Sequence, residues 1–208
     1  GDWSSDVCSS DLALGAGEAP HIRGLHATLP RAGEEAVHFE VGEVAVNVRE
    51  VGAAGDGELA GAAVAYPRTG GTSYWTATGD GYEEWLHLGE GVATGRAPVA
   101  TWEVEGAALQ QAGATVEIVD DDGEAQIRVS APEAFAASGR AVVARLAVRG
   151  STIELWVDAG GEAVLVDPAW TATGAMIAVR GFHTQTTLQN GKVLVTGGYT
   201  GAAALASA

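Results

Sequence analysis

Histidines are the residues of this chain that could most readily bind a metal ion or act as a general base near neutral pH. His21, His26 and His38 occur at irregular spacing near the start of the chain. A zinc or iron site needs three converging ligands held by further hydrogen bonds, and this spacing does not provide them. His183 could be a ligand or a base, but its strand-like surroundings favour packing and a hydrogen bond to the backbone. We therefore expect no metal, no other cofactor and no catalytic histidine.

Two acidic motifs suggest other chemistry. The run DDDGE at 120–124 could bind calcium, but an EF-hand alternates its ligands and ends on a glutamate at position twelve. Consecutive acids between two strand-like runs favour a turn instead. Glu83 and Glu84 could form an acid pair, but neighbours on a strand face opposite sides, so we expect a solvated sheet edge. The acidic motifs predict no catalytic site, and we expect that the chain is not an enzyme.

Tryptophans are the remaining candidates for ligand contact. Five lie after the opening stretch, mainly in strand-like segments, and core packing is the expected role of Trp75, Trp85, Trp102, Trp156 and Trp170. An exposed pair among them could stack on sugar rings.

The opening stretch, residues 1–12, differs in composition from the rest of the chain. Its sequence GDWSSDVCSSDL holds the only cysteine, Cys8. It has no basic n-region and no apolar run, so it is not a signal peptide. The stretch resembles a translated sequencing adapter, and we expect it to play no part in the fold.

Charge and composition exclude several classes of partner. Without the three aspartates of residues 1–12, 24 acidic residues against 11 basic ones leave 13 negative charges. Such a surface disfavours nucleic acid and anionic membranes. No apolar run reaches the roughly 18 residues that a membrane helix needs, so we expect no membrane insertion. With no cysteine after Cys8, a disulfide framework is not expected.

Hydrophobic periodicity predicts strands from about residue 36 to 167. In AVHFEVGEVAVNVREV (36–51) apolar residues alternate with polar ones on both sides of Gly42-Glu43, which is typical of a hairpin. Similar pairs of runs surround the turns at 79–81, 120–123 and Gly150, and further strands are expected at 59–66, 98–105 and 162–167. Only GAALQQAGA (106–114) and PEAFAAS (132–138) hint at helices, and they are short. The fold class is therefore all-β, an antiparallel sandwich-like domain.

Residues 169–208 change in character and contain a second hairpin signal, Asn190-Gly191, before the strand KVLV and a diglycine. This stretch resembles the opening of a Kelch-repeat β-propeller, whose units run to about 50 residues. The resemblance is carried by Trp170, Arg180, His183, Asn190, Gly191, Gly197 and Gly198. It implies that the chain ends in a truncated first propeller hairpin.

The preceding segment resembles, less specifically, a β-rich domain found ahead of Kelch or RHS-type arrays in large secreted bacterial proteins. The sequence segments that carry this resemblance are residues 63–88, 116–140 and 164–170. It implies a fragment of a secreted or cell-surface protein with a non-enzymatic scaffold or binding role. The ligand, a protein or a glycan, would bind through propeller loops outside this chain.

Two alternatives remain open, a galactose-oxidase-like copper enzyme and the carrier region of an RHS-type toxin. The expected organisation is an adapter-like segment (1–12), a linker (13–35), a β-sandwich-like domain (36–168) and the start of a propeller (169–208).

Overall fold

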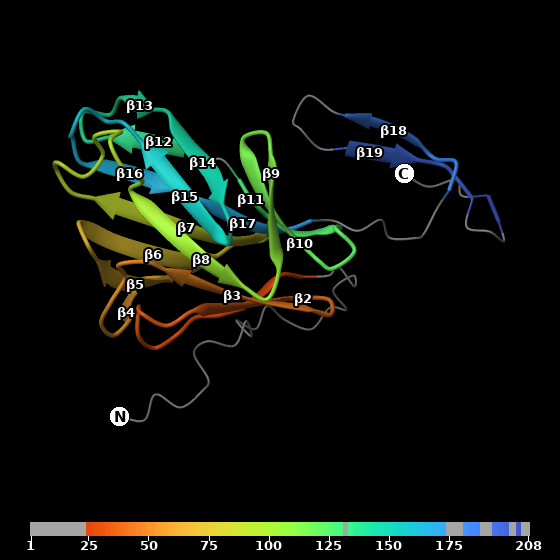
Figure 1. Cartoon of the computed structure of the whole chain (residues 1–208), viewed down its shortest axis with the longest axis horizontal. Helices are drawn as coiled ribbons and strands as arrows, with labels where there is room; N and C mark the ends of the chain where they lie inside the picture. Colours follow the sequence, from red (N-terminus) through yellow and green to blue (C-terminus); the bar gives the residue numbers. More distant parts are fainter. Residues whose placement is uncertain (1–23, 131–132, 174–180, 188–192, 200–202, 205–208) are drawn as a thin grey trace. The chain divides into compact units, whose positions relative to one another are not determined.

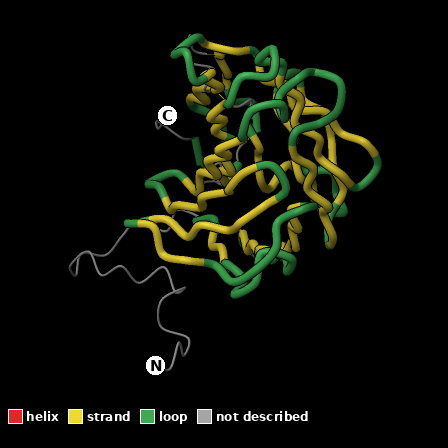
Figure 2. The backbone as a smooth tube through the Cα atoms, turned by 90° about the vertical axis from the view of Figure 1, so that its left-hand side faces the viewer, coloured by secondary structure: helices red, strands yellow, loops and turns green. Residues whose placement is uncertain are grey.

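The computed structural model describes residues 24–130, 133–173, 181–187, 193–199 and 203–204. They fall into two compact units, one ending at Thr173 and one beginning at Gly174. The described residues form strands, turns and loops without a helix (Figure 2). None of them therefore belongs to a helix that could cross a membrane. The predicted all-β, sandwich-like class is confirmed.

The first unit contains a six-stranded antiparallel sheet. Its spatial order is β1 (His26–Thr28), β2 (Val37–Val41), β3 (Val44–Glu50), β8 (Ala100–Glu105), β15 (Thr152–Val157) and β14 (Ala144–Arg149). The hairpin predicted around Gly42 is confirmed, with Val41 opposite Val44. Gly42 has a φ of 61°, a left-handed conformation that glycine adopts without steric cost.

The second sheet of this unit has eleven strands arranged around β7 (Gly81–Leu88). One edge of β7 pairs with β6 (Gly71–Ala77), which continues to β5 (Ala63–Arg68) and β4 (Glu58–Ala60). The other edge pairs with two successive strands, β16 (Val164–Asp167) and β17 (Ala169–Ala172). Beyond β16 lie β12 (Glu133–Ala136) and β13 (Ala141–Val142); beyond β17 lie β11 (Ala125–Val129), β10 (Thr115–Val119) and β9 (Ala108–Ala112).

Pro168 separates β16 from β17. A proline has no backbone N–H to give to a sheet and is found at breaks of the ladder. Its carbonyl still accepts the backbone N–H of Glu84 at 2.9 Å, so both strands stay on the same edge of β7. The register against β7 is the same on both sides of Pro168, so β16 and β17 continue along β7 as one line of pairing.

The two sheets form two layers, with β8 and β15 in front of β7 and β16 in Figure 1. Aromatic side chains fill the space between the layers. The Phe39 ring of the six-stranded sheet lies 5.5 Å from the Trp170 ring of the other sheet, and Trp75 and Tyr82 lie within 6.1 Å of Phe39. Trp102 meets Trp170 edge to face at 5.9 Å. Each such pair adds about 0.5–1.5 kcal/mol to the gain from area burial.

Residues 24–35, predicted as a linker, belong to the first unit as far as the structure describes them. β1 pairs with β2, Leu25 is buried in the core, and Ala32 bridges to Asp56. The linker assignment was therefore wrong for 24–35, because a short run without clear periodicity still gains its hydrogen bonds from β2. Residues 1–23, including the adapter-like segment, lie outside the described residues.

The domain boundary also differs from the one predicted at Pro168. β17 pairs with β7 and β11, and Trp170 is completely buried, so residues 169–173 complete the first unit. The two segments that hinted at helices contain β9 and β12, because the neighbouring strands provide hydrogen-bond partners.

The second unit, described by itself, contains the antiparallel pair β18 (Thr184–Thr187) and β19 (Val193–Thr196). Gly181 and Tyr199 exchange backbone hydrogen bonds just beyond it. The connecting residues 188–192, with the predicted Asn190-Gly191 turn, lie outside the described residues.

Candidate functional site

A row of aromatic and acidic side chains crosses the outer face of the eleven-stranded sheet. β7 alternates strictly, with Tyr82, Glu84, Leu86 and Leu88 buried and the intervening residues partly or fully exposed. Trp85 therefore belongs to the outer face. Its partner across the β6–β7 ladder is Tyr74, also half-buried.

The row continues on the other side of β7. The β16 register pairs Val166 with Leu86, so the next residue, Asp167, lies beside Trp85 on the outer face. Glu133 of β12 is the direct partner of Asp167. We call Tyr74, Trp85, Asp167 and Glu133, with Glu83 adjoining on β7, the aromatic–acidic row.

A hydrogen bond within the row orients the Trp85 ring. Its indole Nε1 donates to Oε2 of Glu83, two residues earlier on the same strand face, at 3.2 Å. Trp156 repeats this arrangement on the outer face of the other sheet, donating to Glu154 at 3.1 Å. The repetition provides an internal comparison between two tryptophans held in the same way.

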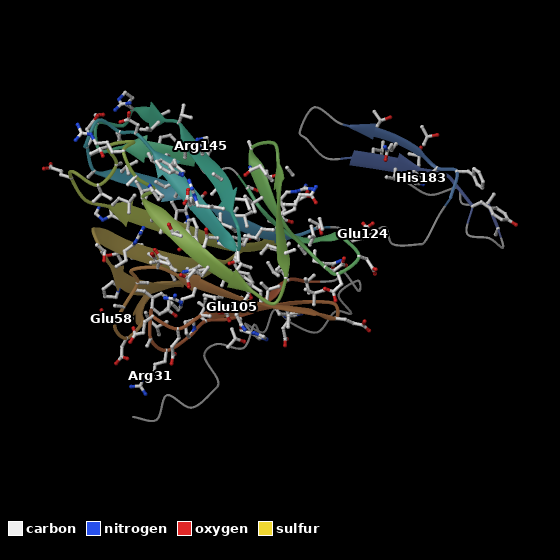
Figure 3. The ribbon with its side chains drawn as sticks, in the orientation of Figure 1. Arg31, Glu58, Glu105, Glu124, Arg145 and His183 are labelled. Carbon is white, nitrogen blue, oxygen red and sulfur yellow. The ribbon has the colours of Figure 1, made fainter. Side chains whose placement is uncertain are left out.

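The two tryptophans differ in what lies over the ring. The guanidinium of Arg145, the partner of Trp156 in the β14–β15 ladder, lies 5.4 Å from the centre of the Trp156 ring (Figure 3 labels Arg145). This is a cation–π contact. Among the described residues no cation occupies that position over Trp85. The face of Trp85 thus lacks the cationic cover that Trp156 has.

The three carboxylates of the row are not neutralised by a cation of the described chain. None of the ion pairs among the described residues includes Glu83, Glu133 or Asp167. Outer-face glutamates of the six-stranded sheet do have such partners, since Arg49 pairs with Glu103 and Arg149 with Glu154. The row is therefore a local concentration of negative charge.

Asp167 shows the effect of this concentration. Partial burial, followed by the negative charges of Glu83 and Glu133, raises the pKa of Asp167 to about 6. Its Oδ1 is buried and accepts no hydrogen bond from the described residues. Asp167 therefore contributes to the row a partly buried carboxyl group with a raised pKa.

The chemistry of the row is that of recognition. Aromatic ring faces can stack against a flat apolar surface, and carboxylates can accept hydrogen bonds from hydroxyl and ammonium groups. No three histidine, cysteine or acidic side chains in the described part of the chain are grouped so that they could hold a metal ion.

The described residues that carried the propeller resemblance are divided between the two units. Trp170 belongs to the core of the first unit, and His183, Gly197 and Gly198 belong to the second. His183 is half-buried, and both glycines have positive φ angles, 68° and 99°. Arg180, Asn190 and Gly191 lie outside the described residues.

The other chemical candidates have clear structural roles. Asp120 accepts the backbone N–H groups of Asp122 and Glu124 at 3.0 and 2.9 Å, and these bonds lower its pKa, so DDDGE is a turn as predicted. His38 contacts Asn47 at 2.8 Å. The expectation that Glu83 and Glu84 face opposite sides is confirmed, but the expected solvated edge was wrong for Glu84, which is completely buried.

Two members of the row, Trp85 and Glu83, are predicted from the sequence only as separate features, a core tryptophan and a surface acid. Residues 83 and 85 lie two positions apart in a strand, which would have placed them on one face. The sequence gives no comparable sign of Tyr74, Asp167 and Glu133, because their positions depend on the β6, β16 and β12 registers.

Comparison with known proteins adds no assignment. No protein-family model, no curated protein and no solved structure matches the chain.

Proposed function

We propose that the first unit is a non-enzymatic binding module of a secreted or cell-surface protein, and that the aromatic–acidic row binds an amino-bearing saccharide. One observation carries the proposal: the outward-facing pair Tyr74–Trp85 stands beside three carboxylates that no cation of the described chain neutralises. The extracellular setting is what the resemblance of residues 63–88, 116–140 and 164–170 to domains of secreted bacterial proteins implies.

Each part of the row would contact a different part of the ligand. A pyranose ring presents a flat C–H face that stacks on tryptophan and tyrosine, and its hydroxyl groups donate to carboxylates. An ammonium group on the sugar complements the negative charge of Asp167, Glu83 and Glu133. A polyanionic saccharide would be repelled by the same charges, which excludes it as the ligand.

The scaffold holds the row in place before any ligand binds. The side chains project from paired strands of one sheet, and the Glu83 hydrogen bond fixes the Trp85 indole. Such preorganisation lowers the entropy cost of binding.

Isothermal titration calorimetry of the full chain with a glucosamine hexasaccharide tests the proposal. We expect saturable binding that Trp85→Ala weakens at least tenfold. Trp156→Ala is the matched control, since it removes an indole held by the same glutamate contact on the other sheet, and should leave the affinity unchanged. Chromatography of the incubated hexasaccharide should show no shortened product.

A second comparison separates the row from the overall negative charge. The triple variant Glu83→Gln, Glu133→Gln, Asp167→Asn should abolish the binding. Its control removes three exposed carboxylates elsewhere, Glu58→Gln, Glu105→Gln and Asp122→Asn, and should retain it (Figure 3 labels Glu58 and Glu105). Equal losses in both variants, or binding of hexa-arginine but not of the saccharide, would contradict the proposal.

A further inference from the structure

Three ionisable side chains are buried between the two sheets, on the opposite side of β7 from the aromatic–acidic row. They are Glu50 at the end of β3, Arg68 at the end of β5 and Glu84 in β7. The side chain of Arg68 is 3% exposed, and Glu84 is completely buried. Burying a charge is expensive unless an opposite charge and hydrogen bonds compensate it, so the charges of this cluster must balance.

Glu50 is the carboxylate that pairs with the guanidinium of Arg68. Its Oε1 lies 2.9 Å from Nε of Arg68, and its Oε2 accepts a hydrogen bond from Oγ of Ser73 at 2.6 Å. Arg68 also donates from Nη2 to the backbone carbonyl of Val99 at 2.7 Å. Glu50 and Arg68 therefore neutralise each other and join β3 to β5 and β6.

Glu84 is left without a cation of its own. Its Oε1 accepts a hydrogen bond from Nε1 of Trp102 at 3.2 Å, whereas Oε2 is buried and accepts none from the described residues. Glu50 and Glu84 lie close enough that the charge of Glu50 raises the pKa of Glu84. Two ionised carboxylates beside one buried guanidinium would leave one negative charge uncompensated, which is costly unless one of them carries a proton. Because Glu50 is paired with Arg68, the proton belongs on Oε2 of Glu84.

The pKa shifts of the two glutamates agree with a proton on Glu84. Burial, then the charge of Glu50, raises the pKa of Glu84 well above its usual value, against the opposing effects of Arg68 and Trp102. Burial also raises the pKa of Glu50, but Arg68, Ser73 and Glu84 counteract it. The elements around the cluster supply Glu50, Arg68, Ser73 and Trp102, and no other ionisable group is among the causes.

A small cavity adjoins Glu50. It is lined by Glu50, Tyr66 and Trp75 on the inside and reaches the exposed Glu35. Its size suits about one water molecule. Glu50 is therefore the member of the cluster that lies beside this cavity.

We infer that Glu84 is a neutral carboxylic acid whose proton is shared with Glu50, and that this single proton controls how firmly the two sheets are held together. Its loss would leave two buried carboxylates against one guanidinium, and the uncompensated charge weakens the inter-sheet contact.

The direction of the pH effect follows from linkage. A carboxyl group with a raised folded-state pKa stabilises the fold relative to its ionised form at pH values below its unfolded pKa of 4.5. That stability is lost as the pH rises from there through the folded pKa. One proton changes the folding equilibrium constant by at most about tenfold per pH unit.

Urea unfolding of the full chain between pH 5 and pH 9 tests the inference, with Asp167→Asn as the background because Asp167 titrates in part of the same range. In this background stability should fall as the pH rises, and adding Glu84→Gln should remove most of the fall. The amide keeps the acceptor for Trp102 and a permanent donor to Glu50. An equal slope with glutamine, or a hundredfold loss of folding constant at pH 5, would overturn the inference.

Infrared spectroscopy provides a second readout if the glutamine variant does not fold. The Asp167→Asn chain should keep the absorption of one protonated carboxyl group at pH 7, where exposed glutamates are ionised. Absence of that absorption at pH 7 would contradict the neutral Glu84.

Discussion

The indole Nε1 of Trp102, on the six-stranded sheet, donates a hydrogen bond to Oε1 of Glu84 on the opposite sheet, over 3.2 Å. Both side chains are completely buried. Trp170 provides a control, since its indole lies in the same aromatic cluster but its Nε1 makes no hydrogen bond within the described structure. A comparison of Trp102 with Trp170 thus separates the effect of a buried hydrogen bond from the effect of aromatic packing.

Replacing Trp102 by phenylalanine should destabilise the protein more than replacing Trp170 by phenylalanine. Both changes remove similar ring volume from the core, but only the first leaves a buried carboxyl oxygen without its donor. The difference in free energy of unfolding, from urea denaturation at neutral pH, should be about 1–3 kcal/mol. Equal losses would show that the hydrogen bond contributes nothing to stability.

Arg68→Met should cost far more stability than Arg49→Met. The first removes the cation from a buried ion pair and leaves Glu50 uncompensated, which costs about 3–5 kcal/mol. Arg49 pairs with Glu103 where both side chains are substantially exposed, and such a pair contributes less than about 1 kcal/mol. Thermal and urea unfolding measure both variants; a loss at Arg68 as small as that at Arg49 would contradict the buried assignment.

The pKa of Asp167 should respond to its two acidic neighbours. Nuclear magnetic resonance titration should find it near 6. The double variant Glu83→Gln, Glu133→Gln should lower it but leave it above 3.8, because partial burial is the larger cause. Since the folded pKa is raised, the contribution of Asp167 to stability is full below pH 3.8 and is lost as the pH rises through about 6. A pKa unchanged in the double variant would show that the three carboxylates do not interact.

The first unit should survive truncation after Thr173 and fail after Pro168. The shorter chain lacks β17 and with it Trp170, whose ring contacts Phe39, Trp75 and Trp102. Removing a buried tryptophan side chain alone costs about 3–5 kcal/mol. Circular dichroism melting curves of residues 1–173 and 1–168 make the comparison. Similar melting temperatures for the two chains would show that the domain boundary lies at Pro168.

Local hairpins could be predicted from the sequence because their signals lie within a few residues. The alternation around Gly42, and the acids of 120–124 around their turn, correspond to the observed pairs β2–β3 and β10–β11. The segments 106–114 and 132–138 were harder, since alanine-rich runs without clear alternation become β9 and β12 only through the neighbouring strands.

The candidate sites depend on contacts between distant parts of the chain. From the sequence, Glu84 is predicted to be one of two adjacent surface acids. In the structure, β3 and β5 place Glu50 and Arg68 beside it. Asp167 lies beside Trp85 because β16, which is distant from β7 in the sequence, pairs with β7 in this register. The alternation within β7 could be predicted from the sequence, but its neighbours on either side could not.

The central claim, that Tyr74, Trp85 and the adjacent carboxylates form the binding surface, is tested most directly by mapping the ligand onto the backbone. Amide shifts of the isotope-labelled full chain are followed by nuclear magnetic resonance during titration with the glucosamine hexasaccharide. We predict saturable shifts concentrated in β6, β7 and β16, with residues around Trp156 unaffected. Shifts centred on the six-stranded sheet, or no saturable shifts, would contradict the claim.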